Sequence, residues 1–281
     1  MKKIIYSVFI LLLFVSCAKS IQEKSDYRVF STADYREISF SDFMKDLASS
    51  DVVLIGETHD SPFDHYVEED LFKRVLKMRN ITLSLEMFER DVQRVLNSYL
   101  AGEITEDSFL KASRPWENYE SDYRNLVEFA KKNKIPVIAA NIPRSLASLV
   151  SKHGSDTLNS ISDIKDFFVK PFSTPDDYKQ RFFDFFSMIV PGMPMSAMSQ
   201  ENIFLSQLFK DATMAFSINK ALSEYPDRLV FMVCGEFHSD YHQGIYQQLK
   251  SINPGIKITT ISISVDSADF DPLKADYLIL K

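Results

Sequence analysis

The stretch VVLIGETH at residues 52–59 has a counterpart near the other end of the chain, VFMVCGEFH at residues 230–238. Each copy is an apolar run that ends in Gly-Glu-x-His. A run of aliphatic and β-branched residues is typical of a buried strand, and glycine followed by charged residues is typical of the loop that leaves it. Each copy therefore places a carboxylate and an imidazole at the exit of a core strand, where ligands bind in doubly wound sheets.

Similar apolar runs occur along the rest of the chain and alternate with amphipathic segments. The pattern predicts strands at residues 51–55, 81–85, 135–140, 229–234, 257–265 and 277–280. It predicts helices at residues 63–78, 122–132 and 239–249. Asp60 or Ser61 followed by Pro62 is a typical helix start. Because strands alternate with helices, we expect an α/β fold with a parallel β-sheet flanked by helices.

Two segments do not fit the sheet pattern and carry helical spacing instead. These are residues 90–121 and 145–224, with helices expected at residues 90–109, 146–150, 177–190 and 200–222. We interpret them as a smaller helical-bundle domain inserted into the parallel-sheet domain. The sheet domain then comprises residues 27–89, 122–144 and 225–281. A length of 281 residues is compatible with this division.

Polar residues follow four of the predicted strands at the point where each strand ends. If the strands are parallel, these residues gather along one edge of the sheet. The alternative is that they only cap strands and helices. Carboxylates and imidazoles together form a ligand or acid–base set. The predicted cluster is Glu57, His59, Glu86, Asn141, Arg144, Glu236 and His238.

The predicted helical domain contains an aromatic and methionine-rich stretch. Phe182, Phe183, Phe185 and Phe186 lead into Met188, Met193, Met195 and Met198. One interpretation is the core of the helical domain. The other is an exposed apolar surface that binds a flat hydrophobic ligand or a second subunit, for which Met and Phe are well suited.

The composition limits the classes of partner. The chain is 45% hydrophobic and 25% charged, which permits a substantial core. Its formal net charge is −7. A nucleic-acid partner is not expected, because binding requires that Lys and Arg neutralise phosphates.

The N-terminus has the pattern of an export signal. A basic start is followed by an apolar segment too short to span a bilayer, which ends in Val15-Ser16-Cys17. This resembles a bacterial lipoprotein signal over residues 1–16, with lipid attached to Cys17 and a tether at residues 17–26. The alternative is an ordinary secretory signal. The second cysteine, Cys234, lies in a predicted strand and is expected to be a small buried hydrophobe.

Several motifs together resemble the ChaN family of the Tiki superfamily. They are GETHD at 56–60, EMF at 86–88, Trp116 with Tyr123, AANIPR at 139–144, Gln207 with DATMA at 211–215, and GEFH at 235–238. That family comprises haem-binding bacterial lipoproteins, often iron-regulated. The resemblance implies a parallel-sheet domain with a small helical bundle, and a homodimer that holds paired haems. It also implies an outer-membrane, lipid-anchored protein that faces the periplasm and serves haem and iron uptake. An outer-membrane haem receptor is a further partner to consider.

The resemblance leaves the axial ligand of the haem iron open. Relatives carry histidine before the Met-Pro-Gly-Met-like segment, but residues 190–195 contain none, and no Cys-x-x-Cys-His motif is present for covalent attachment. Tyrosinate is a hard anionic oxygen ligand that suits ferric iron. The candidates are Tyr178 first, followed by Tyr119, Tyr123 and Tyr241, and each could instead be packed or hydrogen-bonded.

An enzymatic alternative starts from the paired motifs. Other Tiki members use paired Gly-x-x-His motifs in metal-dependent proteolysis, and erythromycin esterases have a related arrangement. His59 and His238 would then bind a divalent metal, with a nearby glutamate as ligand or base and Arg144 stabilising negative charge. His242, four residues after His238 on a predicted helix, could be a further ligand. A third hypothesis is that the edge cluster only braces the two domains.

Overall fold

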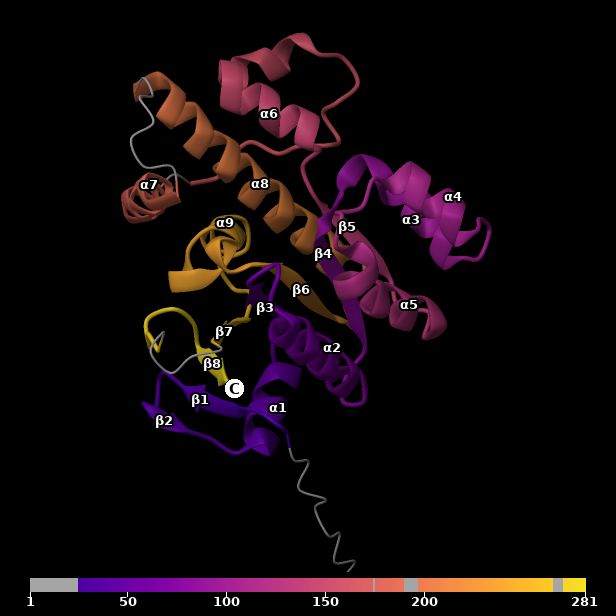
Figure 1. Ribbon diagram of the computed structural model, residues 1–281, viewed down its shortest axis with the longest axis vertical. Coiled ribbons are helices and arrows are strands. Elements are labelled where there is room, and N and C mark those ends of the chain that lie inside the picture. Colours follow the sequence, from indigo (N-terminus) through magenta and orange to yellow (C-terminus); the bar gives the residue numbers. More distant parts are fainter. Residues whose placement is uncertain (1–24, 174, 190–196, 265–269) are drawn as a thin grey trace, which may run out of the picture.

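The computed structural model describes residues 25–173, 175–189, 197–264 and 270–281 (Figure 1). The predicted signal sequence, Cys17 and most of the tether lie outside these residues, as do Met193 and Met195. Within the described part of the chain, no helix is both long enough and apolar enough to cross a membrane.

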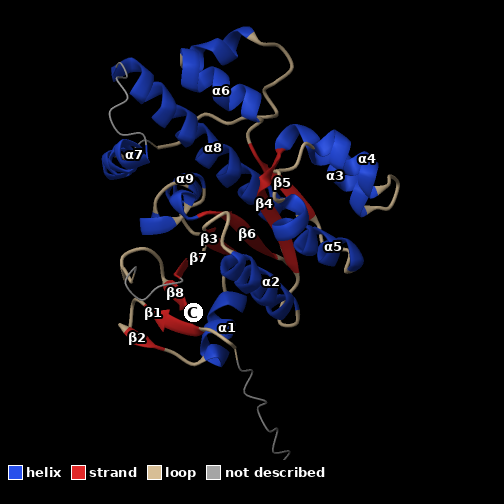
Figure 2. Cartoon of the chain, in the orientation of Figure 1, coloured by secondary structure: helices blue, strands red, loops and turns tan. Residues whose placement is uncertain are grey.

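The core is one eight-stranded sheet with the strand order β2-β1-β8-β7-β3-β6-β4-β5 (Figure 2). Six of the strands run parallel, and β1 and β2 pair antiparallel at one end. The strands are β1 (Arg28–Ser31), β2 (Arg36–Glu37), β3 (Val52–Glu57), β4 (Ile81–Glu89), β5 (Val137–Asn141), β6 (Leu229–Gly235), β7 (Ile258–Ser264) and β8 (Tyr277–Leu280).

Helices cover both faces of the sheet (Figure 1). They are α1 (Phe40–Ala48), α2 (Pro62–Leu76), α3 (Gln93–Leu100), α4 (Glu106–Ser113), α5 (Arg124–Lys132), α6 (Arg144–His153), α7 (Asp176–Ile189), α8 (Ala197–Glu224) and α9 (Ile245–Ile252). Short 3-10 turns cover Arg90–Val92, Ser155–Ser160, Glu236–His238 and Asp240–His242, and a π-helical turn covers Tyr119–Tyr123. The predicted α/β class, the parallel central strands and the flanking helices are confirmed.

Alternation along the central strands divides the core between the two faces. In β3, Val53 and Ile55 join the layer that includes α1, α2 and α5, whereas Val52 and Leu54 join the layer under α8 and α9. All four side chains are fully buried because β3 lies between β6 and β7. This is why its sequence is apolar throughout rather than alternating.

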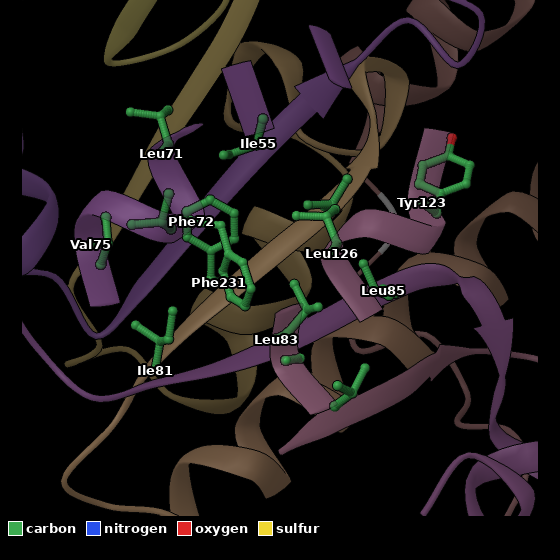
Figure 3. Packing of buried hydrophobic residues seen from close by; sticks show 14 of the residues in the cluster. Ile55, Leu71, Phe72, Val75, Ile81, Leu83, Leu85, Tyr123, Leu126 and Phe231 are labelled. Atoms are coloured by element: carbon green, nitrogen blue, oxygen red, sulfur yellow. The ribbon is translucent and has the colours of Figure 1, made fainter. Parts of the chain in front are cut away.

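Helix α2 packs on the first face through side chains at helical spacing. Leu71, Phe72 and Val75 contact the sheet layer, and the rings of Phe72 and Phe231 lie 5.3 Å apart (Figure 3). Each such side chain stabilises the fold by about 1.5–3 kcal/mol when fully buried. The helix begins as predicted, because Ser61 caps the backbone N–H of Asp64 and Pro62 occupies the first turn.

The sequence pattern missed α1 and the antiparallel end of the sheet, and it misplaced one helix. It also expected one helix at residues 90–109, where the chain forms α3 and the start of α4. Strands β1 and β2 are short and partly exposed, so they lack an apolar run. The expected helix at residues 239–249 begins only at Ile245. Tyr241 and His242 have φ values of 61° and 55°, which break a helix, so His242 does not lie one helical turn after His238.

Helix α8 links the sheet to the outer helices. Met214, Ala215 and Ile218 in its C-terminal half pack on the sheet. In its N-terminal half, Phe204 and Leu208 pack with the residues of α7. The division into a sheet domain and an inserted helical domain stays a prediction.

Candidate functional site

The carboxyl ends of the parallel strands meet at one edge of the sheet, as the motifs predict. Strand β6 lies between β3 and β4, and β5 follows β4. The register pairs Glu57 with Gly235, and Leu85 with Val233 one residue before Glu86. The two Gly-Glu-x-His loops therefore leave adjacent strands on the same side.

The first copy forms a buried carboxylate centre around Glu57. One carboxylate oxygen, Oε1, accepts hydrogen bonds from His59 Nδ1 at 2.7 Å and Tyr123 Oη at 2.6 Å. The other oxygen, Oε2, lies 3.4 Å from Nδ1 of His65 on α2. Burial alone raises the pKa of a carboxyl, but these donors outweigh it and hold the pKa of Glu57 well below its usual range. Glu57 is therefore ionised at neutral pH.

The second copy forms a buried ionic triad around His238. Its Nδ1 donates to Asp211 Oδ1 at 2.5 Å, and its Nε2 lies 3.2 Å from Glu86 Oε1. Burial lowers the pKa of His238, but the charges of Glu86 and Asp211 prevail and raise it to about 9. Burial likewise raises the pKa of Glu86, and the positive charge of His238 lowers it to about 2. At neutral pH His238 is therefore an imidazolium and Glu86 a carboxylate.

The two centres approach each other across Gly235. A Cβ atom at this position would lie 2.8 Å from Nε2 of His59 and 3.8 Å from Oε2 of Glu86. The Gly235 N–H donates to that Glu86 oxygen at 2.9 Å. Glycine is thus required here because the strand backbone itself forms the contact between the two histidine centres.

A cleft of about 350 Å³ opens beside this junction. Glu86 and Trp116 line it together with Asn141, Arg144 and Lys210. Trp116 also contacts the His59 ring edge-on at 4.8 Å between ring centroids. A larger cavity of about 1030 Å³ between α3, β5 and α8 contains none of the predicted site residues.

Three predicted edge residues lie outside the Glu57 and His238 centres. Asn141 lines the cleft, where its Oδ1 accepts from the Ile142 N–H. Arg144 Nε donates to Glu89 at 2.5 Å. Glu236 pairs with Lys274 at 3.1 Å instead of joining the His238 triad.

The four tyrosines proposed as haem ligands are already hydrogen-bonded or packed. Tyr178 is fully buried and donates to Asp211 Oδ2 at 2.8 Å, and Tyr241 donates to Asp271 at 2.9 Å. Tyr119 and Tyr123 are buried as well, the latter on Glu57. Burial, followed by the charge of Asp211, raises the pKa of Tyr178 well above its usual value, which disfavours tyrosinate. The ligand assignment stays a prediction.

The aromatic stretch on α7 is divided between core and surface. Phe182 is buried against Phe204, whereas Phe185 is 43% exposed and Met188 is 71% exposed. One side of α7 therefore belongs to the core and the other is exposed, and the binding role of the exposed side stays a prediction. The side chain of Met198 lies outside what the structure describes.

Sequence reasoning did not assign Asp211, His65 or Glu68 to the site. Asp211 comes from α8, and its signal in the sequence was its place in the DATMA motif at residues 211–215, which was not assigned to the sheet edge. His65 and Glu68 could have been found, because they share the buried stripe of α2 with Leu71, Phe72 and Val75. Charged residues on an apolar stripe need partners, which is a signal of a buried polar centre.

The geometry gives little support to a metal held by His59 and His238. Both ring nitrogens of His238 already face carboxylates, at 2.5 and 3.2 Å. His59 is turned to Glu57 through Nδ1. In this arrangement the Glu57 centre and the His238 triad can each hold protons and relay them between carboxylate and imidazole groups. Metal binding by His59 and His238 stays a prediction.

Comparison with known families identifies the chain. The family described as haem-binding uptake, Tiki superfamily, ChaN matches residues 43–249. The chain belongs to this family. The match covers both Gly-Glu-x-His motifs, so the edge centres of this ChaN-family chain lie in the matched region. Comparison with curated proteins finds no match.

Solved structures share the fold of this ChaN-family chain. A structure described as cofacial heme binding to ChaN of Campylobacter jejuni has 22% identity and a TM-score of 0.72, and the alignment covers 92% of this chain and 98% of that one. The type III effector HopBA1 has 10% identity and a TM-score of 0.50, with 93% and 98% covered. The H289N mutant of the erythromycin esterase EreC has 10% identity and a TM-score of 0.51, with 85% and 77% covered. At these identities the similarity establishes the fold only.

Proposed function

We propose that this protein binds haem and serves haem uptake. The observation that carries the proposal is the family match over residues 43–249, which spans strands β3 to β6 and most of the helices. The resemblance of separate motifs along the sequence points to the same family. The proposal therefore rests on the whole matched region rather than on one short motif.

The apolar side of α7 is the surface that best suits a porphyrin. Phe185 and Met188 are exposed there, and Phe185 lies over the ring of Phe237 at 5.1 Å between centroids. Exposed aromatic and methionine side chains favour flat apolar ligands and subunit contacts. We place the haem on this surface, between two copies of the chain. The cofacial haems described for the Campylobacter jejuni ChaN support a paired arrangement.

The sheet-edge centres are not expected to ligate the haem iron. His238 is buried and held on both sides by carboxylates, so it has no free nitrogen to offer. His59 bonds Glu57 through Nδ1, and its Nε2 faces the backbone at Gly235, which leaves little room for a haem iron. Haem binding is therefore expected to survive the substitutions His59→Ala and His238→Ala.

The N-terminal sequence supports a place for the protein at the membrane. We propose a lipid anchor at Cys17, at the outer membrane and facing the periplasm, with an outer-membrane haem receptor as a candidate partner. The support is the lipoprotein-like signal at residues 1–16.

Mass spectrometry of the protein from bacterial membranes tests the lipid anchor directly. Loss of the lipid adduct in Cys17→Ala is the expected result, and an unmodified Cys17 in the native chain would rule out the anchor.

Titration of the purified chain with haemin tests the function. We expect a saturable shift of the Soret band, and the same shift in His59→Ala and His238→Ala. A Soret band that stays that of free haemin at stoichiometric protein would refute haem binding. Single Tyr→Phe substitutions at the four candidate positions then identify any tyrosine ligand by the change in the haem spectrum.

A further inference from the structure

Three metal-ligating side chains converge behind the sheet edge, on the side of α2. Glu57 ends β3, and His65 and Glu68 follow one another at i, i+3 on α2. All three are buried, and one potential ligand atom from each lies within 4.8 Å of the others. His65 and Glu68 are not used by the proposed haem function.

The hydrogen bond on the far side of His65 orients its ring toward the carboxylates. His65 Nε2 lies 3.1 Å from the backbone carbonyl oxygen of His59, which can only accept a hydrogen bond. Nε2 must therefore carry a proton. Its other nitrogen, Nδ1, then faces Glu57 Oε2 at 3.4 Å and Glu68 Oε2 at 3.2 Å. Nδ1 can meet the two carboxylates either through a proton of its own or, once that proton is lost, through a cation that all three groups share.

Two carboxylate oxygens of the cluster have no hydrogen-bond donor. They are Oε2 of Glu57 and Oε1 of Glu68, and both are buried. Leaving a buried acceptor unpaired costs about 1–3 kcal/mol, and more when it is charged. A cation that accepts these lone pairs would remove that cost.

The distances from His65 to the two carboxylates suit a coordination shell. Atoms bound to one ion at about 2.1 Å lie roughly 3.0 to 3.4 Å apart in octahedral or tetrahedral geometry. The separations of His65 Nδ1 from the two glutamates, 3.2 and 3.4 Å, fall in this range. We propose that Glu57, His65 and Glu68 form a binding site for a divalent transition-metal ion of the Zn²⁺ or Mn²⁺ class.

Hydrogen bonds from neighbouring groups hold these three side chains in position, as they do for the ligands of known metal sites. The His59 carbonyl fixes the tautomer of His65, and the His59 ring and Tyr123 hold the second oxygen of Glu57. One imidazole and two carboxylates is a donor set that suits Zn²⁺ and Mn²⁺ better than Ca²⁺, which takes oxygen ligands alone.

The competing occupant of the cluster is a proton. Burial and the charge of Glu57 raise the pKa of Glu68 well above its usual value, which favours the protonated form when no metal is bound. Glutamine has the shape and the donor group of a protonated glutamate. Glu68→Gln therefore preserves the proton-bound cluster but removes one ligand of the metal site. This substitution separates a cluster that holds only protons from one that binds a metal ion.

Isothermal titration of untagged, chelator-treated protein with Zn²⁺ alone and Mn²⁺ alone tests the site. We expect one ion per chain, with release of protons on binding, because the metal displaces them from His65 and Glu68. Glu68→Gln is expected to weaken binding at least ~10-fold while keeping a native circular dichroism spectrum. His65→Asn provides a second lesion with the same expectation, and the neighbouring Glu69→Gln is the matched control that retains affinity.

Two results would overturn the site. One is a folded native chain that binds neither ion. The other is a Glu68→Gln variant with unchanged affinity and stoichiometry, which would locate any ion elsewhere. Haem binding is measured separately by absorption, so either proposal can fail without the other.

Discussion

His238 shows how a single buried residue holds the sheet edge together. It comes from the second Gly-Glu-x-His motif and is 6% exposed, between Glu86 of β4 and Asp211 of α8. An isolated buried charge would be strongly destabilising, but two carboxylates compensate this one. His238 thereby connects three elements that are distant in sequence.

The pKa of His238 predicts a pH-dependent stability. In the folded state it is about 9, against the ordinary value of 6.5, so the folded protein holds this proton more tightly. This contribution is fully present below pH 6.5 and is lost as the pH rises through about 9. It corresponds to ~3 kcal/mol of unfolding free energy. Urea unfolding at pH 6.5 and pH 9.5 measures the difference.

His238→Gln is expected to abolish most of that difference between the two pH values, whatever its effect on overall stability. His153→Gln serves as the control, since His153 is exposed at the end of α6 and should leave the difference intact. An equal pH dependence in wild type and His238→Gln would be incompatible with the triad.

Tyr178 carries a second prediction at this scale. Its hydroxyl group donates to Asp211 in a fully buried setting. Tyr178→Phe leaves that oxygen short of a donor and should lower the unfolding free energy by ~1–3 kcal/mol. Chemical denaturation measures this loss of unfolding free energy, with the less buried Tyr241→Phe for comparison.

The same variant tests ligation of the haem iron. A haem spectrum unchanged in Tyr178→Phe would contradict ligation by this tyrosine.

The sequence predicted the motif residues of the site but not their partners. Glu57, His59, Glu86 and His238 follow apolar strands, and local pattern is enough to place such residues at one sheet edge. Asp211 is brought in by the packing of α8, which no local pattern encodes. The same holds for the pairing of Glu236 with Lys274, because the loop that carries Lys274 follows β7 far along the chain.

At the scale of elements, strand β3 and the turn after β6 touch at a glycine. A Cβ on Gly56 would lie 2.9 Å from the backbone Cα of Glu236 and 2.6 Å from Ser239 Oγ. Gly56→Ala must therefore push the second motif away from the first. We expect a loss of ~1–3 kcal/mol in unfolding free energy, as is usual for overpacking.

Gly255→Ala is the matched control for Gly56→Ala, because a Cβ there meets no atom within 4 Å. Thermal unfolding of the two variants side by side makes the comparison. Equal melting temperatures would show that the two motif loops are not in contact.

Helix α7 carries the prediction for ligand binding. Met188 is 71% exposed on the surface assigned to haem, so Met188→Asp should weaken haemin binding by roughly 10-fold or more through lost apolar contact. Met78→Asp introduces the same change at the end of α2, where Met78 is 48% exposed, and should leave the affinity unchanged. Equal haemin affinities in the two variants would remove α7 from the binding surface.

For the whole molecule, the parallel sheet and its helices were predictable because β3, β4 and β6 are buried on both faces and read as apolar runs. Strands β1 and β2 were not, because β1 owes its conformation to pairing with β8, and β2 owes its conformation to pairing with β1. The late start of α9 also escaped prediction, since left-handed residues at 241 and 242 leave no hydrophobic signal.

The central proposal for the whole molecule is that two copies of this chain hold haem between them. Sedimentation velocity of the haemin-loaded protein, followed both in the protein band and in the Soret band, tests it most directly. We predict that haem sediments with a dimer and that haem-free protein shifts toward the monomer. Soret absorbance that stays with free haemin, or that sediments only with a monomer, would contradict the claim.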